Sequence, residues 1–317
     1  MNTALAVVLF VVGLALVVYF AEKLVEGVVG TSLGFGVSAF ILSVVFIGFD
    51  PENLGVGAVG SFEGSHGIAL GAIVGAAMVA IALAFGLTAV FAPMKFGKAP
   101  RSVLMVPVAA GALLAVLARD GLLSRLDGLL LLLGFGVAVL FLVFLSRRGL
   151  DIEPGGEVEE VLEEEEAPGR WKSLALFVVS LVAIIAGSEL LVRSAQHLVE
   201  AIGISDTLFG MTILAFLVSI EELARELPAA MKGRADITFG NVVGSVLAFF
   251  LFNAGIIALV RPVEVGTPVL DFYLPVALAT IMFISLLMVS RRMPRWAGVV
   301  LIAAYVAFVA GGFVGWT

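Results

Sequence analysis

Long apolar runs, separated by short polar stretches, follow one another along almost the whole chain of 317 residues. Ten such segments lie at residues 3–21, 35–61, 67–92, 103–118, 122–146, 173–192, 205–230, 238–260, 269–290 and 296–316. Most approach the ~20 residues with which a helix crosses a hydrocarbon layer of ~30 Å, whereas barrel strands would be about half as long and would alternate in polarity. The pattern predicts an all-α membrane protein with ten transmembrane helices. The first run lacks a preceding positive segment and is too long for a signal peptide, so we expect it to be retained.

Composition narrows the possible functions. Hydrophobic residues make up 61% of the chain and charged residues 14%, whereas soluble domains are about 45–50% apolar and about 25% charged. A soluble enzyme is therefore excluded, and no basic stretch suits a nucleic acid. The chain has no cysteine, which excludes disulfides and thiolate metal sites. We expect the lipid bilayer and inorganic cations as partners, no cofactor and no enzymatic activity; nothing in the sequence specifies an oligomeric state.

The formal net charge of −7 comes from one loop. Nine acidic residues lie between Asp151 and Glu166, and the rest of the chain is weakly positive without them. Because these like charges repel one another, we interpret residues 147–172 as a solvated linker. A calcium-sensing linker is the alternative, but the EF-hand spacing is absent. The linker divides the chain into a first half at 1–146 and a second half at 173–317.

Basic residues predict the orientation, because they accumulate in cytoplasmic loops. If the N-terminus is outside, thirteen of the 18 basic residues fall at the inner ends of the segments and four at the outer ends. The thirteen are Lys23, Lys95, Lys98, Arg101, Arg147, Arg148, Arg170, Lys172, Lys232, Arg234, Arg291, Arg292 and Arg295. We therefore expect a multi-pass protein of the cell membrane with both termini outside and the linker in the cytoplasm.

The two halves contain an internal repeat with an offset of 169 positions. Without a gap, the offset aligns Glu52 with Glu221, Leu54 with Leu223, and the glycines of the first half with those of the second. The aligned glycine pairs are Gly34 and Gly203, Gly64 and Gly233, Gly71 and Gly240, and Gly75 and Gly244. The repeated regions are 34–80 and 203–253. Because each half has an odd number of spans, the halves are expected to be inverted five-helix repeats with a binding site at their interface.

Acidic residues inside two apolar segments mark the candidate site. A charged side chain at mid-bilayer costs at least ~2.5–3.5 kcal/mol, so such acids face the bundle interior and have partners. They are Asp50 and Glu52 in the second segment, and Glu221, Glu222 and Glu226 in the seventh. Pro51 predicts a helix break, since it removes a helical hydrogen bond, and carbonyl groups freed at such a break can bind a cation. Carboxylate, amide and carbonyl oxygens are the ligands of hard divalent cations.

Helical spacing ranks these candidates. Positions i and i+3 share a helix face, which pairs Asp50 with Asn53 and Ser219 with Glu222. We therefore rank Asp50, Asn53 and Glu222 as the nearest ligands. Glu52 and Glu221 follow, although a break at Pro51 could turn Glu52 toward the cation. The alternative is a structural ion pair of Arg225 with Glu221 or Glu222, and for Glu226 pairing or snorkelling is favoured.

Two motifs in each half resemble those of the cation/calcium exchanger superfamily. Its sodium/calcium branch carries Gly-Thr-Ser-Leu-Pro-Glu-Leu in each repeat, followed by Gly-Asn-x-x-Gly-Ser-Asn. The corresponding runs here are GFDPENL at 48–54, GAIVGAA at 71–77, LVSIEEL at 217–223 and GNVVGSV at 240–246. The resemblance implies ten spans, inverted repeats and an outside N-terminus. It also implies that the first and sixth helices move past the repeat core.

The resemblance also implies a role for individual residues at the motif positions. Glu222 matches the second essential glutamate of the family, whereas Asn53 stands where the first is expected. Asp50 and Glu52 would then supply the missing charge. The resemblance assigns Ser219, Asn241 and Ser245 to polar positions of the site. The motif threonines are replaced by Phe49 and Val218, and Ala72 and Ala76 replace further polar positions, so oxygens that the family uses for Na⁺ are missing.

These observations predict a secondary antiporter that exchanges a divalent cation, Ca²⁺ above all, for Na⁺ or H⁺ by alternating access. The expected metal ligands are Asp50, Glu52, Asn53, Ser219, Glu221, Glu222, Asn241 and Ser245. An exchanger for Mg²⁺ or Mn²⁺ and a cation-binding protein that does not transport are the alternatives. An intramembrane aspartyl protease would need paired carboxylates on facing helices, but Gly203 to Asp206 match a protease signature poorly.

Overall fold

The computed structural model describes residues 2–36, 49–95, 101–146, 169–231 and 235–314. Most of the predicted second segment before Asp50 and nearly all of the acidic linker lie outside these ranges. For Arg225, Ala229 and residues 235–239 the structure describes the backbone alone, so the expected ion pair of Arg225 lies outside the described side chains.

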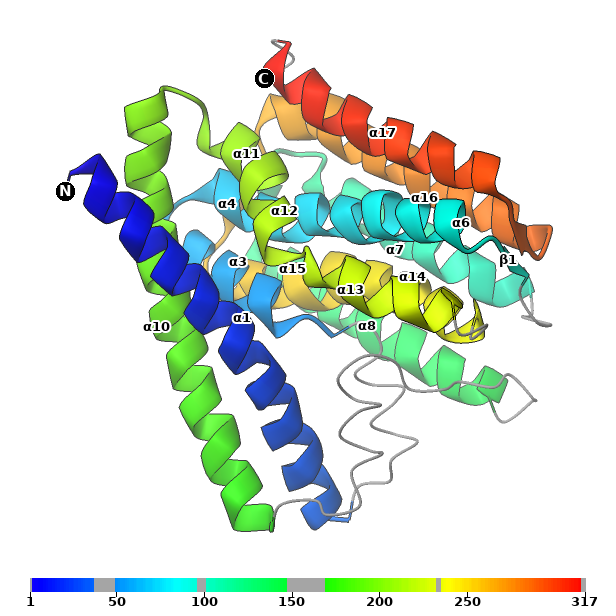
Figure 1. Cartoon of the computed structure of the whole chain (residues 1–317), viewed down its shortest axis with the longest axis horizontal. Helices are drawn as coiled ribbons and strands as arrows, with labels where there is room; N and C mark the ends of the chain where they lie inside the picture. The colour runs from blue at the N-terminus through cyan, green and yellow to red at the C-terminus, as the bar shows by residue number, and fades with distance from the viewer. Residues whose placement is uncertain (1, 37–48, 96–100, 147–168, 232–234, 315–317) are drawn as a thin grey trace.

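Helices make up nearly all of the described chain (Figure 1). In the first half they are α1 (Thr3–Gly34), α3 (Pro51–Glu63), α4 (His66–Leu70), η1 (Gly71–Gly75), α5 (Ala76–Met78), η2 (Val79–Ala84), α6 (Phe85–Phe91), α7 (Arg101–Ala118) and α8 (Arg125–Ser146). In the second half they are α10 (Arg170–Ile202), α11 (Asp206–Phe209), η3 (Gly210–Leu214), α12 (Ala215–Val218), α13 (Glu221–Met231), α14 (Ala235–Leu247), η4 (Ala248–Asn253), α15 (Ala254–Val260), η5 (Val269–Tyr273), α16 (Leu274–Val289) and α17 (Arg295–Phe313). The η segments are π-helical turns inside longer helices.

Eight helices within the described ranges are long and apolar enough to cross a membrane. They span Thr3–Gly34, His66–Phe91, Arg125–Leu145, Arg170–Ile202, Asp206–Pro228, Gly240–Val260, Val269–Val289 and Arg295–Phe313. The fourth predicted segment forms the shorter apolar helix Val103–Ala118. The prediction of a helical, multi-pass membrane protein is confirmed.

Two of the predicted spans, 3–21 and 173–192, are too short. The helices α1 and α10 continue to Gly34 and Ile202. An apolar run indicates only the part of a helix that lies in the hydrocarbon layer, and the helix can continue beyond it through polar residues. Lys23, expected near an inner loop, lies within α1 and forms a salt bridge of 2.8 Å with Glu26.

The helices α1 and α10 pack closely along one side of the molecule (Figure 1). A Cβ atom on Gly13 would lie 2.8 Å from the carbonyl oxygen of Gly187, and one on Gly34 would lie 2.6 Å from Cβ of Arg170. Along α1 from Gly13 to Gly34, the contacted residue of α10 moves back from Gly187 to Arg170. The two helices are therefore antiparallel and held by small residues, as is common between membrane helices.

Several elements of the two halves coincide after the shift of 169. The shift carries η2 onto η4, α6 onto α15, and strand β1 (Met94–Lys95) onto β3 (Val263–Glu264), with the same bounds in each case. Local structure therefore repeats where sequence identity is low. The π-helical turns make this coincidence informative, because such turns are rare and occur frequently at functional sites.

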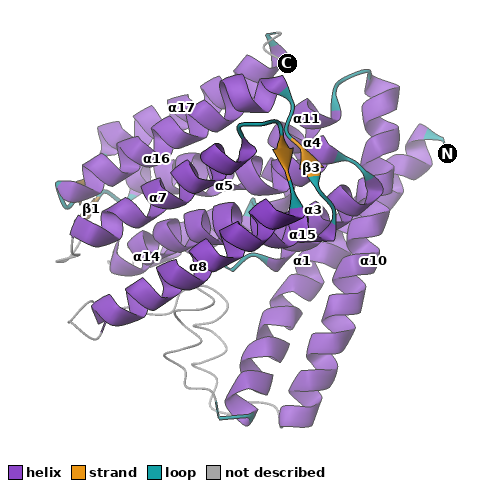
Figure 2. Ribbon diagram, turned by 180° about the vertical axis from the view of Figure 1, so that it is seen from behind, coloured by secondary structure: helices purple, strands orange, loops and turns teal. Residues whose placement is uncertain are grey.

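Two small sheets connect the halves to each other. Strand β1 pairs with β4 (Arg292–Met293), and β3 pairs with β2 (Leu122–Leu123), both antiparallel. Figure 2 shows the pair of β2 and β3 near α3 and α4. Each strand of the first half thus pairs with a strand of the second half, so exchanging the halves leaves the pairing pattern unchanged.

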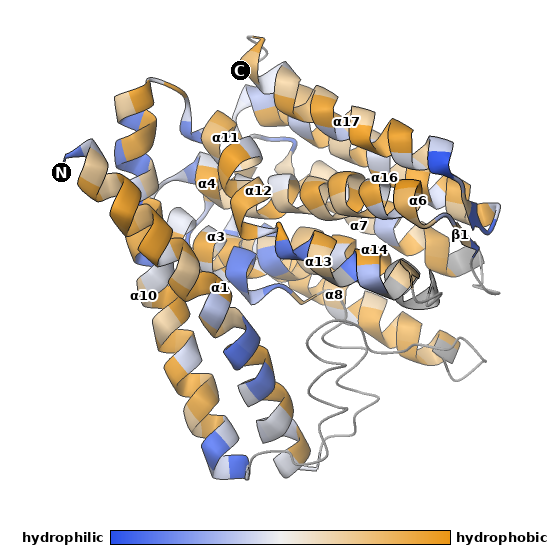
Figure 3. Ribbon diagram, viewed as in Figure 1, coloured by the Kyte–Doolittle hydropathy of each residue, from blue (hydrophilic) through white to orange (hydrophobic). Residues whose placement is uncertain are grey.

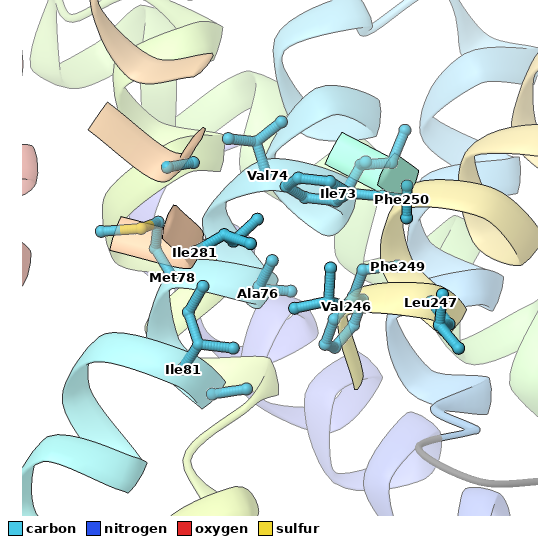
Figure 4. Packing of buried hydrophobic residues seen from close by; sticks show 14 of the residues in the cluster. Ile73, Val74, Ala76, Met78, Ile81, Val246, Leu247, Phe249, Phe250 and Ile281 are labelled. Carbon is cyan, nitrogen blue, oxygen red and sulfur yellow. The ribbon is translucent and has the colours of Figure 1, made fainter. Parts of the chain in front are cut away.

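The core lies between the third and eighth predicted spans. Figure 4 shows Ile73 and Val74 on one side and Val246, Phe249 and Phe250 on the other, all buried. The outward faces are also apolar: Leu140 on α8 is 70% exposed. Figure 3 shows hydrophobic residues along most of α6 and α17 and polar residues around α13. An apolar surface outside and polar groups within are what a bilayer requires.

Candidate cation site at two helix breaks

At the first break that the sequence predicts, the described chain has a helix start, at Pro51. Asp50 has an extended backbone, with φ −132° and ψ 91°, and is the N-cap of α3, whose first residue is Pro51. Proline suits this position because the first helical N–H has no partner in any case. Pro51 therefore begins the helix after the break.

The second break lies between α12 and α13 and needs no proline. Ser219 ends α12 with φ −105° and ψ 14°, and α13 begins at Glu221. The N–H groups of Glu222 and Leu223 donate to the carbonyls of Ser219 and Ile220 over three residues, at 3.2 Å each. This tighter turn replaces the α-helical pattern. Ser219 and Glu222, which the sequence analysis placed on one continuous helix, are thus related by this turn.

A hydrogen-bond chain joins the two breaks. The Asp50 carboxylate accepts the backbone N–H of Asn53 at 2.7 Å and its Nδ2 at 2.9 Å. The same Nδ2 donates to Oγ of Ser219 at 2.8 Å. All three side chains are buried. Asp50 and Asn53 pair as predicted, but through an N-cap rather than through a shared helix face.

Glu222 belongs to a second group of polar side chains. Nδ2 of Asn241, on α14, lies 3.2 Å from Oε2 of Glu222 and 3.1 Å from Oε1 of Glu226. Glu226 is 2% exposed, so of the two expectations for it, pairing or snorkelling, the burial contradicts snorkelling. Its side chain is held inside by α14, and the bonds from Asn241 account for part of its hydrogen-bonding capacity.

Electrostatic contacts connect the two groups. The carboxylate of Asp50 interacts with those of Glu222 and Glu221, and Glu222 interacts with Glu226. The described residues contain no set of three His, Cys, Asp or Glu side chains arranged to hold a metal ion by themselves.

The remaining predicted ligands lie close by along the helices. Glu52 is buried in the first turn of α3, and Glu221 is half-buried in the first turn of α13. Acids are favoured in a first helical turn by the helix dipole. Ser245, one turn after Asn241, is fully buried, and its Oγ has no hydrogen-bond partner within the described part of the chain.

Asn253 is a residue that the sequence analysis missed. It ends the π-helical turn η4 and is fully buried. Its Nδ2 lies 3.5 Å from the backbone oxygen of Asp50, and its Oδ1 has no hydrogen-bond partner among the described groups. The repeat aligns it with Ala84, so the second half adds an amide where the first has none. The only sequence signal for Asn253 is that it is an uncharged polar residue within an apolar run.

Two apolar residues stand where the resemblance places threonines. Phe49 packs with Ala21, Leu24 and Ile184 of α1 and α10. Val218 packs in a cluster that includes Phe10. Both side chains therefore contribute to contacts between the two breaks and the pair α1–α10, where a hydroxyl group would have no comparable apolar contact.

Comparisons with known proteins give a consistent result. The family described as "Sodium/calcium exchanger protein" matches residues 5–144 and 172–314. Inner membrane protein YrbG of Escherichia coli is 30% identical over 321 residues, covering 96% of each chain. Sodium/calcium exchanger MaX1 of Methanosarcina acetivorans is 36% identical over 140 residues, covering 44% of this chain and 40% of MaX1. The solved structure of the sodium–calcium exchanger NCX_Mj, soaked with 2.5 mM Na⁺ and 0.1 mM Ca²⁺, superposes with a TM-score of 0.62 at 26% identity and covers 96% of this chain and 98% of that one.

Proposed function

The chain belongs to the sodium/calcium exchanger family, and on this premise we propose that it is a secondary antiporter that exchanges Ca²⁺ for Na⁺ or H⁺. The observation that carries the proposal is the buried hydrogen-bond chain from Asp50 through Asn53 to Ser219, which joins two helix breaks beside Glu222. Discontinuous helices with oxygen ligands are the form in which many transporters bind cations.

We further propose that the halves 1–146 and 173–317 are inverted repeats related by a pseudo-two-fold axis. The antiparallel pairing of the equivalent helices α1 and α10 supports this arrangement. The reciprocal pairing of β1 with β4 and of β3 with β2 supports it as well. In this arrangement the chain has ten spans, both termini lie outside and the linker 147–172 lies in the cytoplasm.

Exchange follows from competition for one set of oxygens. Asp50, Asn53, Ser219 and Glu222 would bind Ca²⁺, with Glu52, Glu221, Asn241 and Ser245 around them. A counter-ion that takes the same carboxylates displaces Ca²⁺, so the two are never bound together. The pair α1–α10 contacts the residues just before both breaks through Phe49 and Val218, and movement of this pair would open the site to one side at a time.

The ligand set favours a divalent cation. Two close carboxylates, those of Asp50 and Glu222, balance the two charges of Ca²⁺, and carboxylate, amide and hydroxyl oxygens all suit it. Mg²⁺ fits less well because it demands near-octahedral geometry and retains its waters. The unpartnered oxygen of Asn253 would replace one oxygen lost with the family threonines.

Flux into liposomes tests the proposal. Purified protein in liposomes should take up ⁴⁵Ca²⁺ when an outward Na⁺ gradient or H⁺ gradient is imposed, and protein-free liposomes should not. The gradient that drives uptake identifies the counter-ion, and unlabelled Mg²⁺ and Mn²⁺ as competitors rank the cations. If neither gradient drives uptake although Ca²⁺ raises the melting temperature, the protein binds the cation without transporting it.

Removing the Asn253 oxygen should weaken Ca²⁺ binding without abolishing it. We expect Asn253→Leu, which is similar in size, to raise the half-saturating Ca²⁺ concentration by roughly three- to tenfold, since one uncharged polar contact is worth about 0.5–1.5 kcal/mol. The control is Glu264→Gln, at an exposed acid of β3. An unchanged concentration dependence in Asn253→Leu would remove this residue from the site.

A further inference from the structure

Glu226 lies outside the set of oxygens assigned above, yet it is nearly as buried as Glu222. Its Oε1 accepts a hydrogen bond from Asn241, whereas its Oε2 has no partner among the described groups. Burying a carboxylate beside another carboxylate costs free energy unless a positive charge or full hydrogen bonding offsets it. One amide shared with Glu222 gives only part of that hydrogen bonding.

The repeat shows that this group is an addition to the second half. The shift of 169 aligns Glu226 with Gly57, and Ile257 with Thr88. A Cβ atom on Gly57 would overlap Cδ1 of Ile257, so α3 and α15 touch at this point through apolar atoms.

The equivalent contact in the other half is polar. There α13 packs against α6, and the repeat makes Glu226 the counterpart of Gly57 and Thr88 the counterpart of Ile257. Thr88 is fully buried on α6, and its Oγ1 also lacks a hydrogen-bond partner among the described groups. Two buried oxygens without a hydrogen-bond partner among the described groups therefore lie on these two packed helices. Buried polar groups are nearly always satisfied, and exceptions call for an explanation such as an ion.

We propose that Glu222, Glu226, Asn241 and Thr88 form a second position for a divalent cation, one helical turn along α13 from the break. The inference rests on the proposed function, because the ion reaches this position from the first one. Glu222 belongs to both positions, so a single ion occupies them in turn. Two carboxylates balance its charge, and a half-turn of the Asn241 amide presents Oδ1 in place of Nδ2.

Such a position gives the ion a staging point in the middle of α13, beyond the break. With this position, the dehydrated ion travels a shorter part of its path without contact to a carboxylate. The first half lacks this staging point, because Gly57 and Ile257 stand in its place. The pathways of the ion to the two sides of the membrane would therefore differ, because only one of them contains the second position.

Anomalous diffraction from crystals soaked in Mn²⁺ tests the proposal. We expect two partly occupied peaks, one between Asp50 and Glu222 and one between Glu222 and Glu226. The second should be lost in Glu226→Gln and weakened in Thr88→Val, a near-isosteric change that preserves folding. Glu264→Gln, at an exposed acid of β3, is the control and should retain both peaks.

The outcomes separate this inference from the proposed function. A single peak beside Asp50, or a second peak that persists in Glu226→Gln, overturns the second position and leaves the exchanger intact. Absence of both peaks overturns the first site as well. In liposomes, Glu226→Gln should slow ⁴⁵Ca²⁺ exchange by about tenfold, the usual size of an effect from one supporting ligand, and Glu264→Gln should not.

Discussion

Replacing Glu222 with glutamine is expected to abolish gradient-driven ⁴⁵Ca²⁺ uptake. The substitution preserves side-chain size but removes the one carboxylate that interacts with both Asp50 and Glu226. A buried contact to a charged group is worth about 1.5–3 kcal/mol, which corresponds to roughly a 10- to 150-fold loss of Ca²⁺ affinity. The turnover should fall further, because of the two carboxylates assigned to bind the ion directly only that of Asp50 remains.

Three measurements make this result specific. The melting temperature of Glu222→Gln without Ca²⁺ should equal or exceed that of the wild type, since the change relieves repulsion with Asp50 and Glu226. The increase in melting temperature caused by Ca²⁺ should be lost. Glu264→Gln should behave like the wild type in both assays. Wild-type uptake in Glu222→Gln would show that the site lies elsewhere.

The apolar helices and the break at Pro51 could be predicted because they depend on local sequence. Apolar runs of sufficient length form helices in lipid whatever they pack against. Pro51 and the neighbouring acids marked the first break, whereas the second, at Ser219, contains no proline and was not predicted. The helix ends at Gly34 and Ile202 were not predictable in this way, since they depend on packing between α1 and α10.

The partners within the site depended on tertiary structure. The spacing argument paired Ser219 with Glu222 along one continuous helix, whereas the structure bonds Ser219 to Asn53 of the other half. Asn253 carries no charge and matches no motif, so only its distance to Asp50 reveals it. Glu226 was assigned to the helix end from its position in sequence, although α14 encloses it. In each case the decisive contact joins residues from different helices.

A close approach of two helices from different halves predicts the second large effect. A Cβ atom on Gly71 would overlap the carbonyl group of Gly210, and one on Gly210 would overlap that of Gly67. Backbone atoms in two packed helices cannot turn aside as a side chain can. We therefore expect Gly71→Val to destabilise the protein by about 3 kcal/mol or more, the upper end of the range for overpacked cores.

Alanine at two helical glycines provides the sharpest form of this test, because local and tertiary effects then have opposite signs. Alanine favours a helix over glycine by roughly 0.5–1 kcal/mol, so Gly136→Ala, where an added Cβ meets no atom within 4 Å, should leave the melting temperature in detergent unchanged or higher. Gly71→Ala should lower it, since the overlap with Gly210 outweighs the same local gain. Equal shifts in the two variants would mean that the helices separate freely at this crossing. A lower melting temperature in Gly71→Ala alone would mean that the distance between the halves, and with it the geometry of the two breaks, depends on the absence of a side chain at Gly71.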